Sequence, residues 1–276
     1  MPLPAADLDY VRDFVRRTSA IVLDDKEYLI EARLGTLALT EGHASILNLL
    51  RALREESGPK PLHRKVVDAL TTNETSFFRD IHPFEAIRKT ILPEASARKR
   101  GRKSLRLWSA ACSSGQEPVS LAMTLAQSFP QLADWRVQIL ATDLSDEMLD
   151  RARSGRYSQI EINRGLPAPM LVRFFEQHGG DWRVRPEILQ MIRYERFNLI
   201  EPWPVRAPFD LILLRNVMIY FDLAAKCEIL SNMAAALAPE GYLMLGASET
   251  IAGLDVPLEM VMIDRSALCR RKPVTS

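Results

Sequence analysis

The chain has 276 residues, of which 47% are hydrophobic and 26% are charged. This composition excludes collagen-like, low-complexity and wholly disordered chains, and the length allows either one large domain or a small domain joined to a larger one. Because 36 Lys and Arg face 35 Asp and Glu, the net charge is +1 and no global field draws the protein to nucleic acid. We therefore expect no nucleic-acid partner.

The cysteines and histidines are scattered along the chain. The three cysteines form no CxxC pair and the four histidines form no HExxH motif, so the sequence predicts neither a disulfide framework nor a metal site. The N-terminus lacks a basic stretch followed by an apolar one, and no uncharged apolar run is long enough to span a membrane. We expect a cytoplasmic protein without direct membrane insertion.

Residues 1–70 carry a helical pattern. Apolar residues recur at spacings of three and four, as in Leu8, Val11 and Val15 and again from Ile46 to Leu53. This spacing predicts a small N-terminal domain of about four helices. Residues 71–104 are interpreted as a linker that contacts the ligand of the next domain.

From Leu105 onward, short apolar runs alternate with helical stretches. The helices are expected from about Glu117, over Asp146 to Ala152 and over Leu223 to Leu237. Such alternation predicts an α/β domain over 105–276, with a doubly wound parallel sheet covered by helices on both faces. Between Gly155 and Asn198 this alternation of strands and helices lapses around a Gly-Gly turn, which predicts an inserted antiparallel β-subdomain at about 158–197.

Ligands of open α/β sheets bind at the carboxyl ends of the strands, so the residues after each apolar run are candidates for a site. The first run is followed by small residues, from Ser109 through Gly115, which let a ligand approach the backbone. The turn lacks the GxGxxG pattern of dinucleotide sites, and Glu117 at the helix start would repel a phosphate. These features favour a nucleoside that carries a cationic or ammonium group.

The later strand ends also carry polar residues. Asp143 follows the second run, where its carboxylate can accept hydrogen bonds from both hydroxyls of a ribose; alternatively it caps the helix that starts near Ser145. Asn198 and the Arg215-Asn216 pair follow two further runs. Tyr220 is either a rim residue or, with Phe221, part of the core.

One further polar segment, Thr71 to Asp80, joins the helical region to the α/β region. It is rich in hydroxyl and amide side chains, contains Arg79, and lies at a domain junction, where binding clefts are common. The alternative is a loop with a helix cap and two core phenylalanines.

Together these segments resemble the CheR-type chemotaxis receptor methyltransferases. The resemblance rests on six stretches in that family's order: TTNETSFFRD, LWSAACSSGQEPVSLAMTL, ATDLSDEMLDRARSGRY, FNLIEPWP, FDLILLRNVMIYFD and GYLMLGASE. It implies a helical N-terminal domain and a Rossmann-like domain that binds S-adenosylmethionine (SAM), with a small β-subdomain inserted in it. The implied activity is methyl transfer from SAM to glutamate side chains in the cytoplasmic helical domain of chemoreceptors, with S-adenosylhomocysteine as product.

The resemblance also implies the site residues. Asp143 would hold the ribose, Asn198 and Leu199 would flank the adenine, and Glu117 would face the cofactor's ammonium group. Arg79 and Tyr220 are the implied catalytic residues near the reacting end. The complete set of implied cofactor contacts is Asn73, Thr75, Arg79, Ala111, Glu117, Asp143, Asn198, Leu199, Leu214, Arg215 and Asn216.

Two departures from the family pattern bear on partners. Residues Phe175 to Arg183, FEQHGGDWR, are shorter than the glycine-containing loop of members that tether to a receptor's C-terminal peptide, so we expect no dependence on a tail peptide. The helix with Lys26 and Arg33 has fewer arginines than the family often shows, so we expect weaker or differently arranged receptor docking.

Two other functions are compatible with the same residues. A methyltransferase for another acceptor is one; for a nucleic-acid base, however, LRNVMIYF lacks the usual proline pair and the net charge is near zero. A SAM-binding sensor or adaptor without catalysis is the other. The presence of both Arg79 and Tyr220 favours an enzyme.

Overall fold

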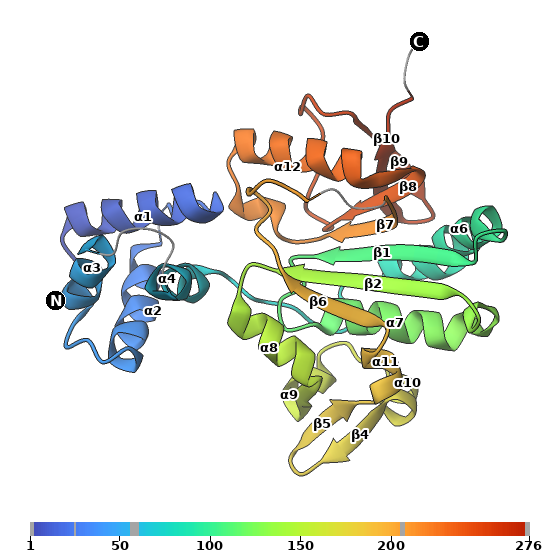
Figure 1. The fold of residues 1–276 in the computed structure, drawn as a ribbon, viewed down its shortest axis with the longest axis horizontal. Coiled ribbons are helices and arrows are strands. Elements are labelled where there is room, and N and C mark those ends of the chain that lie inside the picture. The colour runs from blue at the N-terminus through green and yellow to red at the C-terminus, as the bar shows by residue number, and fades with distance from the viewer. Residues whose placement is uncertain (1–2, 25, 56–60, 205–207, 274–276) are drawn as a thin grey trace.

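The computed structural model describes residues 3–24, 26–55, 61–204 and 208–273 (Figure 1). A group of N-terminal helices lies beside a larger α/β domain, and a small three-stranded sheet projects from the α/β domain. Within these residues no helix combines the length and hydropathy that crossing a membrane requires.

The N-terminal helices form around their apolar stripes. In α3, for example, Leu49, Leu50 and Leu53 lie on the buried face. The four helices are α1 (Ala5–Ser19), α2 (Glu27–Thr40), α3 (Ile46–Glu55) and α4 (Pro61–Leu70).

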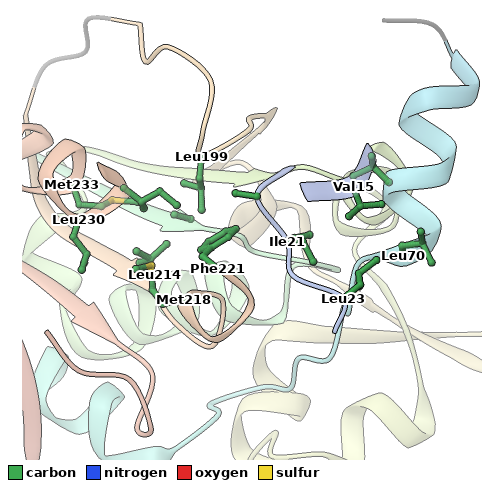
Figure 2. Packing of buried hydrophobic residues seen from close by; sticks show 14 of the residues in the cluster. Val15, Ile21, Leu23, Leu70, Leu199, Leu214, Met218, Phe221, Leu230 and Met233 are labelled. Carbon is green, nitrogen blue, oxygen red and sulfur yellow. The ribbon is translucent and has the colours of Figure 1, made fainter. Parts of the chain in front are cut away.

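The N-terminal helices share one apolar core with the α/β domain. Figure 2 shows Ile21 and Leu23, in the connector after α1, between Val15 of α1 and Phe221 of the α/β domain. Because this apolar cluster is continuous, burial of apolar surface holds the two parts together.

The interval predicted as a linker has two parts. Residues 71–80 are irregular, whereas residues 81–99 form a continuous helical segment of α5 (Ile81–Ala86), the π-helix η1 (Ile87–Ile91) and α6 (Leu92–Lys99). Phe84, Ile87 and Ile91 are buried in the core of the α/β domain. The helical part therefore belongs to that domain, and only 71–80 connects the two.

The central sheet has the strand order β6-β2-β1-β7-β8-β10-β9. Its first five strands are parallel neighbours, and β10 is antiparallel to both β8 and β9. The chain leaves β1 toward β2 on one side and later returns to β7 on the other, as in doubly wound folds. The strands are β1 (Ser104–Ala110), β2 (Arg136–Asp143), β6 (Ile192–Arg196), β7 (Phe209–Leu214), β8 (Leu237–Leu245), β9 (Leu258–Ile263) and β10 (Ser266–Arg271).

Helices cover both faces of this sheet, which confirms the predicted fold class. In β7, Ile212 and Leu214 belong to the apolar cluster that includes α12, whereas Leu211 and Leu213 belong to the cluster that includes α7. The main helices start and end close to the predicted positions: α7 (Gln116–Ser128), α8 (Asp146–Ser154) and α12 (Leu223–Ala236). A 3-10 turn, η2 (Pro130–Leu132), follows α7, and another, η3 (Met218–Tyr220), follows β7.

The small sheet is antiparallel, in the order β3-β5-β4. It consists of β3 (Arg156–Ser158), β4 (Phe175–His178) and β5 (Asp181–Val184), accompanied by α9 (Gln159–Asn163), α10 (Ala168–Phe174) and α11 (Pro186–Leu189).

The predicted extent of this subdomain, about 158–197, differs from the structure at its end. Strand β6 does not belong to the small sheet but pairs in parallel with β2 as an edge strand of the central sheet. An edge strand is only partly covered, so it tolerates the charged residues of Ile192–Arg196 that suggested a separate unit.

Candidate active site

A cavity lies at the carboxyl ends of four neighbouring parallel strands, β6, β2, β1 and β7. This is the place where a doubly wound sheet binds its ligand, because the connections on the two sides of β1 diverge there. The sheet contributes residues 111–113, 143–144, 197–199, 215–217 and 220–221, and the connecting segment contributes 71–76 and Arg79.

The turn after β1 presents backbone to this cavity. Ala111 and Ser113 have positive φ angles, 58° and 50°, and Gly115 has a φ of 92°. A Cβ atom at Gly115 would lie 2.8 Å from the Cβ of Ala152, so a side chain does not fit there. Such sparsely populated backbone angles persist where surrounding contacts enforce them.

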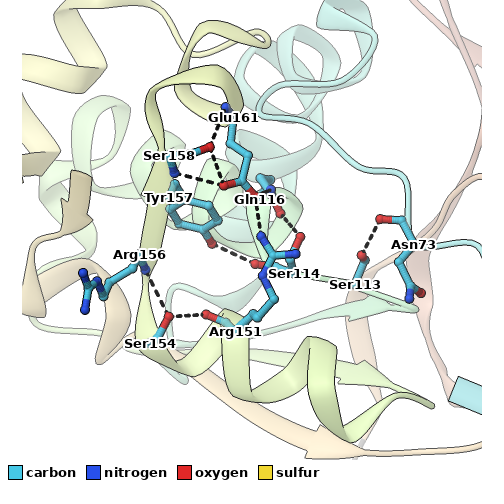
Figure 3. A network of polar contacts seen from close by, with 10 residues as sticks. All are labelled: Asn73, Ser113, Ser114, Gln116, Arg151, Ser154, Arg156, Tyr157, Ser158 and Glu161. Atoms are coloured by element: carbon cyan, nitrogen blue, oxygen red, sulfur yellow. Dashed lines mark hydrogen bonds and ion pairs between the residues drawn. The ribbon is translucent and has the colours of Figure 1, made fainter. Parts of the chain in front are cut away.

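A polar network beneath the turn supplies those contacts (Figure 3). The buried Tyr157 hydroxyl donates to the carbonyl oxygen of Ser114 at 3.0 Å, and the Ser114 hydroxyl donates to Gln116 Oε1 at 2.8 Å. Gln116 Nε2 donates to Glu161, which also accepts a hydrogen bond from Arg151 at 2.7 Å. Because burial raises the pKa of Tyr157, its hydroxyl keeps the proton that it donates. The β-subdomain and α8 thus hold the turn in place.

Asp143 is a buried carboxylate at the end of β2, 7% exposed. It accepts the backbone N–H of Ser113 at 2.7 Å and that of Ser145 at 3.0 Å. Burial raises its pKa, an effect that these N–H groups oppose. The cap of α8 is instead Ser145, whose hydroxyl accepts from the N–H of Met148. Since a carboxylate has about four acceptor positions, Asp143 can still accept hydrogen bonds from a ligand in the cavity.

Arg215 and Glu117 form a buried ion pair, with side chains that are 2% and 12% exposed. The guanidinium of Arg215 donates to Glu117 Oε2 at 3.0 Å, and the other carboxylate oxygen of Glu117 accepts from the Ser109 hydroxyl at 2.7 Å. Arg215 also donates to the carboxylate of Asp80 at 2.9 Å and to the carbonyl oxygen of Arg79 at 2.7 Å. It therefore fixes Glu117 and joins the 71–80 segment to the sheet.

Arg79 and Tyr220 both line the cavity. Arg79 is half-buried, and its Nη1 donates to the carbonyl oxygen of Glu74 at 3.0 Å. The Nζ of Lys26 lies 5.5 Å from the centroid of the Tyr220 ring. An arginine and a phenol thus line the same cavity, which suits an anionic acceptor group.

The comparison with known families bears directly on this cavity. A model described as "CheR methyltransferase, SAM binding domain" matches residues 73–266. The chain belongs to the CheR methyltransferase family. Its cofactor is therefore SAM, and it is a SAM-dependent methyltransferase of the chemotaxis type.

Relatives within the CheR family align over nearly the whole chain. The chain is 40% identical to chemotaxis protein methyltransferase 1 of Pseudomonas aeruginosa, covering 97% of this chain and 98% of the relative. It is 39% identical to chemotaxis protein methyltransferase 1 of Vibrio cholerae, with coverages of 97% and 98%. It is 38% identical to chemotaxis protein methyltransferase Cher2 of Pseudomonas putida, with coverages of 96% and 98%.

The residues present in the cavity suit the cofactor of the CheR family. The small-residue turn exposes backbone, Asp143 offers acceptors for ribose hydroxyls, and Glu117 supplies a carboxylate beside them. Most residues predicted for the site line this one cavity: Asn73, Thr75, Arg79, Ala111, Glu117, Asp143, Asn198, Leu199, Arg215, Asn216 and Tyr220.

Leu214, also predicted as a cofactor contact, is placed elsewhere. Its side chain is fully buried in the apolar cluster between the sheet and α12, outside the cavity lining. The apolar run Phe209–Leu214 is buried on both faces, so the sequence gives no indication of which way its last side chain points.

The N-terminal region also contributes to this CheR-family cavity, although the sequence did not predict it. Ser19 and Ile21 line it, and Ile21 forms an antiparallel bridge with Phe221. The N–H of Val22 donates to the carbonyl oxygen of Tyr220 at 2.9 Å, and Asn198 Nδ2 donates to the carbonyl oxygen of Thr18 at 2.9 Å. The β-branched pair after α1, Ile21 and Val22, was the signal for an extended segment.

Leu144 and Phe197 also line the cavity and were not predicted. They directly follow β2 and β6, at the positions where the sequence already placed polar candidates. Apolar neighbours of such candidates would flank the flat base of a nucleoside.

Cys112 lines the cavity as well, but it is not an activated nucleophile. Burial raises the pKa of its thiol well above the usual value, and the charges of Asp143 and Glu117 act in the same direction. Among the residues that the structure describes, no three His, Cys, Asp or Glu side chains are grouped to hold a metal ion.

Proposed function

We propose that the protein methylates glutamate side chains in the cytoplasmic helical domain of chemoreceptors, forming glutamyl methyl esters and releasing S-adenosylhomocysteine. The single observation that carries the proposal is that Arg79 and Tyr220 lie on the cavity that also contains Asp143 and Glu117. The cavity of a chain from the CheR family thus combines groups for a nucleoside with groups for an anionic acceptor. The names of the full-length relatives support the chemotaxis context.

The cofactor's position is proposed from the cavity wall. Asp143 would accept from the ribose hydroxyls, because its carboxylate is fixed by two backbone N–H groups and faces the cavity. Asn198 and Leu199 would lie beside the adenine. Glu117 would face the ammonium group, with its carboxylate held in place by the ion pair with Arg215.

The acceptor needs little chemical activation. The glutamate side chain, with a reference pKa of about 4.3, is ionised at neutral pH, so transfer requires no general base. When bound, SAM supplies an electrophilic methyl group on a positively charged sulfur, which a carboxylate oxygen can take.

Positioning of the acceptor is the part that the protein's own residues must perform. We infer that the guanidinium of Arg79 orients a carboxylate through charge-assisted hydrogen bonds, and that Tyr220, which lines the same cavity, assists it. Exclusion of water then favours transfer, because the negative acceptor and the positive sulfur lose charge together.

Receptor recognition is proposed to be independent of a tail peptide. In the β-subdomain, His178 and Asp181 pair directly across Gly179 and Gly180, so the hairpin turn is tight and offers no long loop. A titration of the protein with peptides from receptor C-termini should show no saturable binding. Micromolar affinity for such a peptide would contradict this part of the proposal.

Mass spectrometry of the acceptor tests the proposed reaction. A purified cytoplasmic fragment of a chemoreceptor is incubated with the protein and SAM, digested, and searched for glutamates that have gained one methyl group. Glutamine at the modified positions should abolish the gain there. Methylation of other residue types alone, or SAM binding without any modification, would contradict the proposed acceptor.

A further inference from the structure

We propose that Glu249 is a positioning residue of the active site, which acts by fixing the backbone turn that carries Asn216 and Tyr220. This inference rests on the proposed function, since it concerns the geometry of methyl transfer. Glu249 follows β8, whose end lies next to the end of β7 because the two strands are parallel neighbours. It lies outside the cavity lining, so it acts on the site through other residues.

The carboxylate of Glu249 accepts three backbone N–H groups. Its Oε2 accepts from Asn216 at 2.9 Å and from Gly246 at 2.6 Å, and its Oε1 accepts from Met218 at 2.7 Å. Its own N–H donates to the carbonyl oxygen of Gly246 at 2.9 Å. Bonds from N–H groups to a charged carboxylate are stronger than those to neutral acceptors. One side chain therefore joins the ends of two strands.

The turn that Glu249 holds needs such support. Asn216 has a φ of 57°, in the left-handed region, and it stands between the end of β7 and η3. Asn216, Val217 and Tyr220 all line the cavity. They lie within residues 216–220, which also carry the two N–H groups of this turn, those of Asn216 and Met218, that donate to Glu249. A shift of this turn would move all three side chains together, with Tyr220 at the reacting end.

The close approach also explains a glycine. A Cβ atom at Gly246 would lie 2.8 Å from the backbone nitrogen of Asn216 and 2.8 Å from Glu249 Oε2. Only a residue without a side chain leaves room for the carboxylate to reach the turn.

Glu249→Gln is the decisive substitution. It keeps the shape of the side chain, but its amide nitrogen replaces one acceptor oxygen and then faces N–H donors in either orientation of the amide. We expect kcat for receptor methylation at saturating SAM to fall by about 10- to 100-fold, because small misplacements of catalytic groups have effects of that size. SAM affinity should change less, because only Asn216 of the implied cofactor contacts lies on this turn, whereas Asp143, Asn198 and Glu117 are untouched.

A matched control separates this effect from the loss of a charge. Glu259 lies on β9 and pairs with Arg270 at 2.7 Å on the surface, so Glu259→Gln should leave kcat unchanged. In Glu249→Gln, amide hydrogen exchange should be faster at Asn216 and Met218. Adding Tyr220→Phe to Glu249→Gln should lower kcat little further, because both substitutions disturb the same group. Wild-type kcat, or losses from Glu249→Gln and Tyr220→Phe that simply multiply, would overturn the proposal.

The role of Glu249 can still be tested if Glu249→Gln does not fold or if the wild-type protein methylates no receptor. If Glu249→Gln does not fold, Glu249→Asp keeps the charge but is one methylene shorter, and it should fold with lowered kcat; wild-type kcat would overturn the proposal. If the wild-type protein binds SAM but methylates no receptor, the proposed function fails. The exchange rates of Asn216 and Met218 then still decide the role of Glu249, since unchanged protection in the variant would contradict it.

Discussion

The cavity has an inner wall and an outer rim that are built differently. The inner wall, made by the turn after β1 with Asp143, Glu117 and Arg215, is buried, and each of its charged groups has at least two partners. The outer rim, made by residues 71–79, is largely half-exposed and contains Arg79, with one bond to a carbonyl oxygen. A prearranged wall suits an unvarying ligand, whereas an accessible rim suits a protein acceptor.

Asp143→Asn is the strongest test of the inner wall. The amide nitrogen cannot accept hydrogen bonds, so one of the two fixed N–H groups or a ribose hydroxyl loses its partner. We expect SAM affinity to fall by about 100-fold, the size of one lost hydrogen bond to a charged group. Calorimetric titration with SAM and with S-adenosylhomocysteine measures the change.

A nearby aspartate provides the control for Asp143. Asp150 lies exposed on α8, where it pairs with Arg153 at 2.7 Å, so Asp150→Asn should keep wild-type affinity. Similar affinities for both variants would mean that the inner wall does not hold the cofactor through Asp143.

Arg79→Ala tests the rim. Because Arg79 is proposed to orient the acceptor, kcat/KM for the receptor should fall by roughly 10- to 100-fold while SAM affinity and the melting temperature change little. Arg79→Lys should recover only part of the loss, since an ammonium group lacks the planar fork of donors. Steady-state kinetics at saturating SAM gives the comparison, with Arg88→Ala, on the exposed side of η1, as control.

The opposite outcome for Arg79 is equally informative. Near-wild-type turnover in Arg79→Ala would remove it from the mechanism. A loss confined to SAM affinity would move Arg79 from the acceptor side of the cavity to the cofactor side, and the distinction between wall and rim would fail at this residue.

The smallest expected effect concerns stability at the contact between α4 and α8, where Asp68 of α4 lies near Asp146 of α8. We call this contact the seam. Burial, together with the nearby charge of Asp146, raises the pKa of Asp68 from 3.8 to about 6, although Arg196 opposes this. The folded state therefore binds the proton more tightly than the unfolded state. The stability that this carboxyl contributes is fully present below pH 3.8 and is lost as the pH rises through about 6.

Asp68→Asn mimics the protonated carboxyl at every pH. After allowance for solvent screening, it should raise the free energy of unfolding by about 1 kcal/mol at pH 8, and the gain should shrink toward pH 4. Thermal unfolding of both proteins at several pH values measures this. A gain that is independent of pH, or a loss at pH 8, would show that partial burial does not raise the pKa of Asp68.

Most of the sheet and the inner wall could be predicted from the sequence, because buried parallel strands are apolar runs and the polar residues after them meet at one edge. Asp143 and the turn before Gln116 are such cases. The side chain of Leu214, a cofactor contact implied by the resemblance, lies outside the cavity lining, and a strand buried on both faces carries no alternation that would orient its last side chain.

Other features depended on contacts between distant segments. The pairing of Ile21 with Phe221 joins parts of the chain 200 positions apart, and no local pattern specifies it. Glu249 ends the stretch GYLMLGASE, which resembles the family, but its role depends on where three backbone N–H groups point. The charged strand β6 was assigned to the wrong sheet, because its sequence resembles a solvated hairpin.

The measurement that tests the central claim most directly is the alkaline lability of the transferred methyl group. The protein is incubated with methyl-labelled SAM and receptor-bearing membranes, and the washed products are treated with alkali. We predict release of labelled, volatile methanol, as expected of a glutamyl methyl ester, with little release when Arg79→Ala replaces the wild type. Bound SAM without alkali-labile label on any receptor would contradict the account.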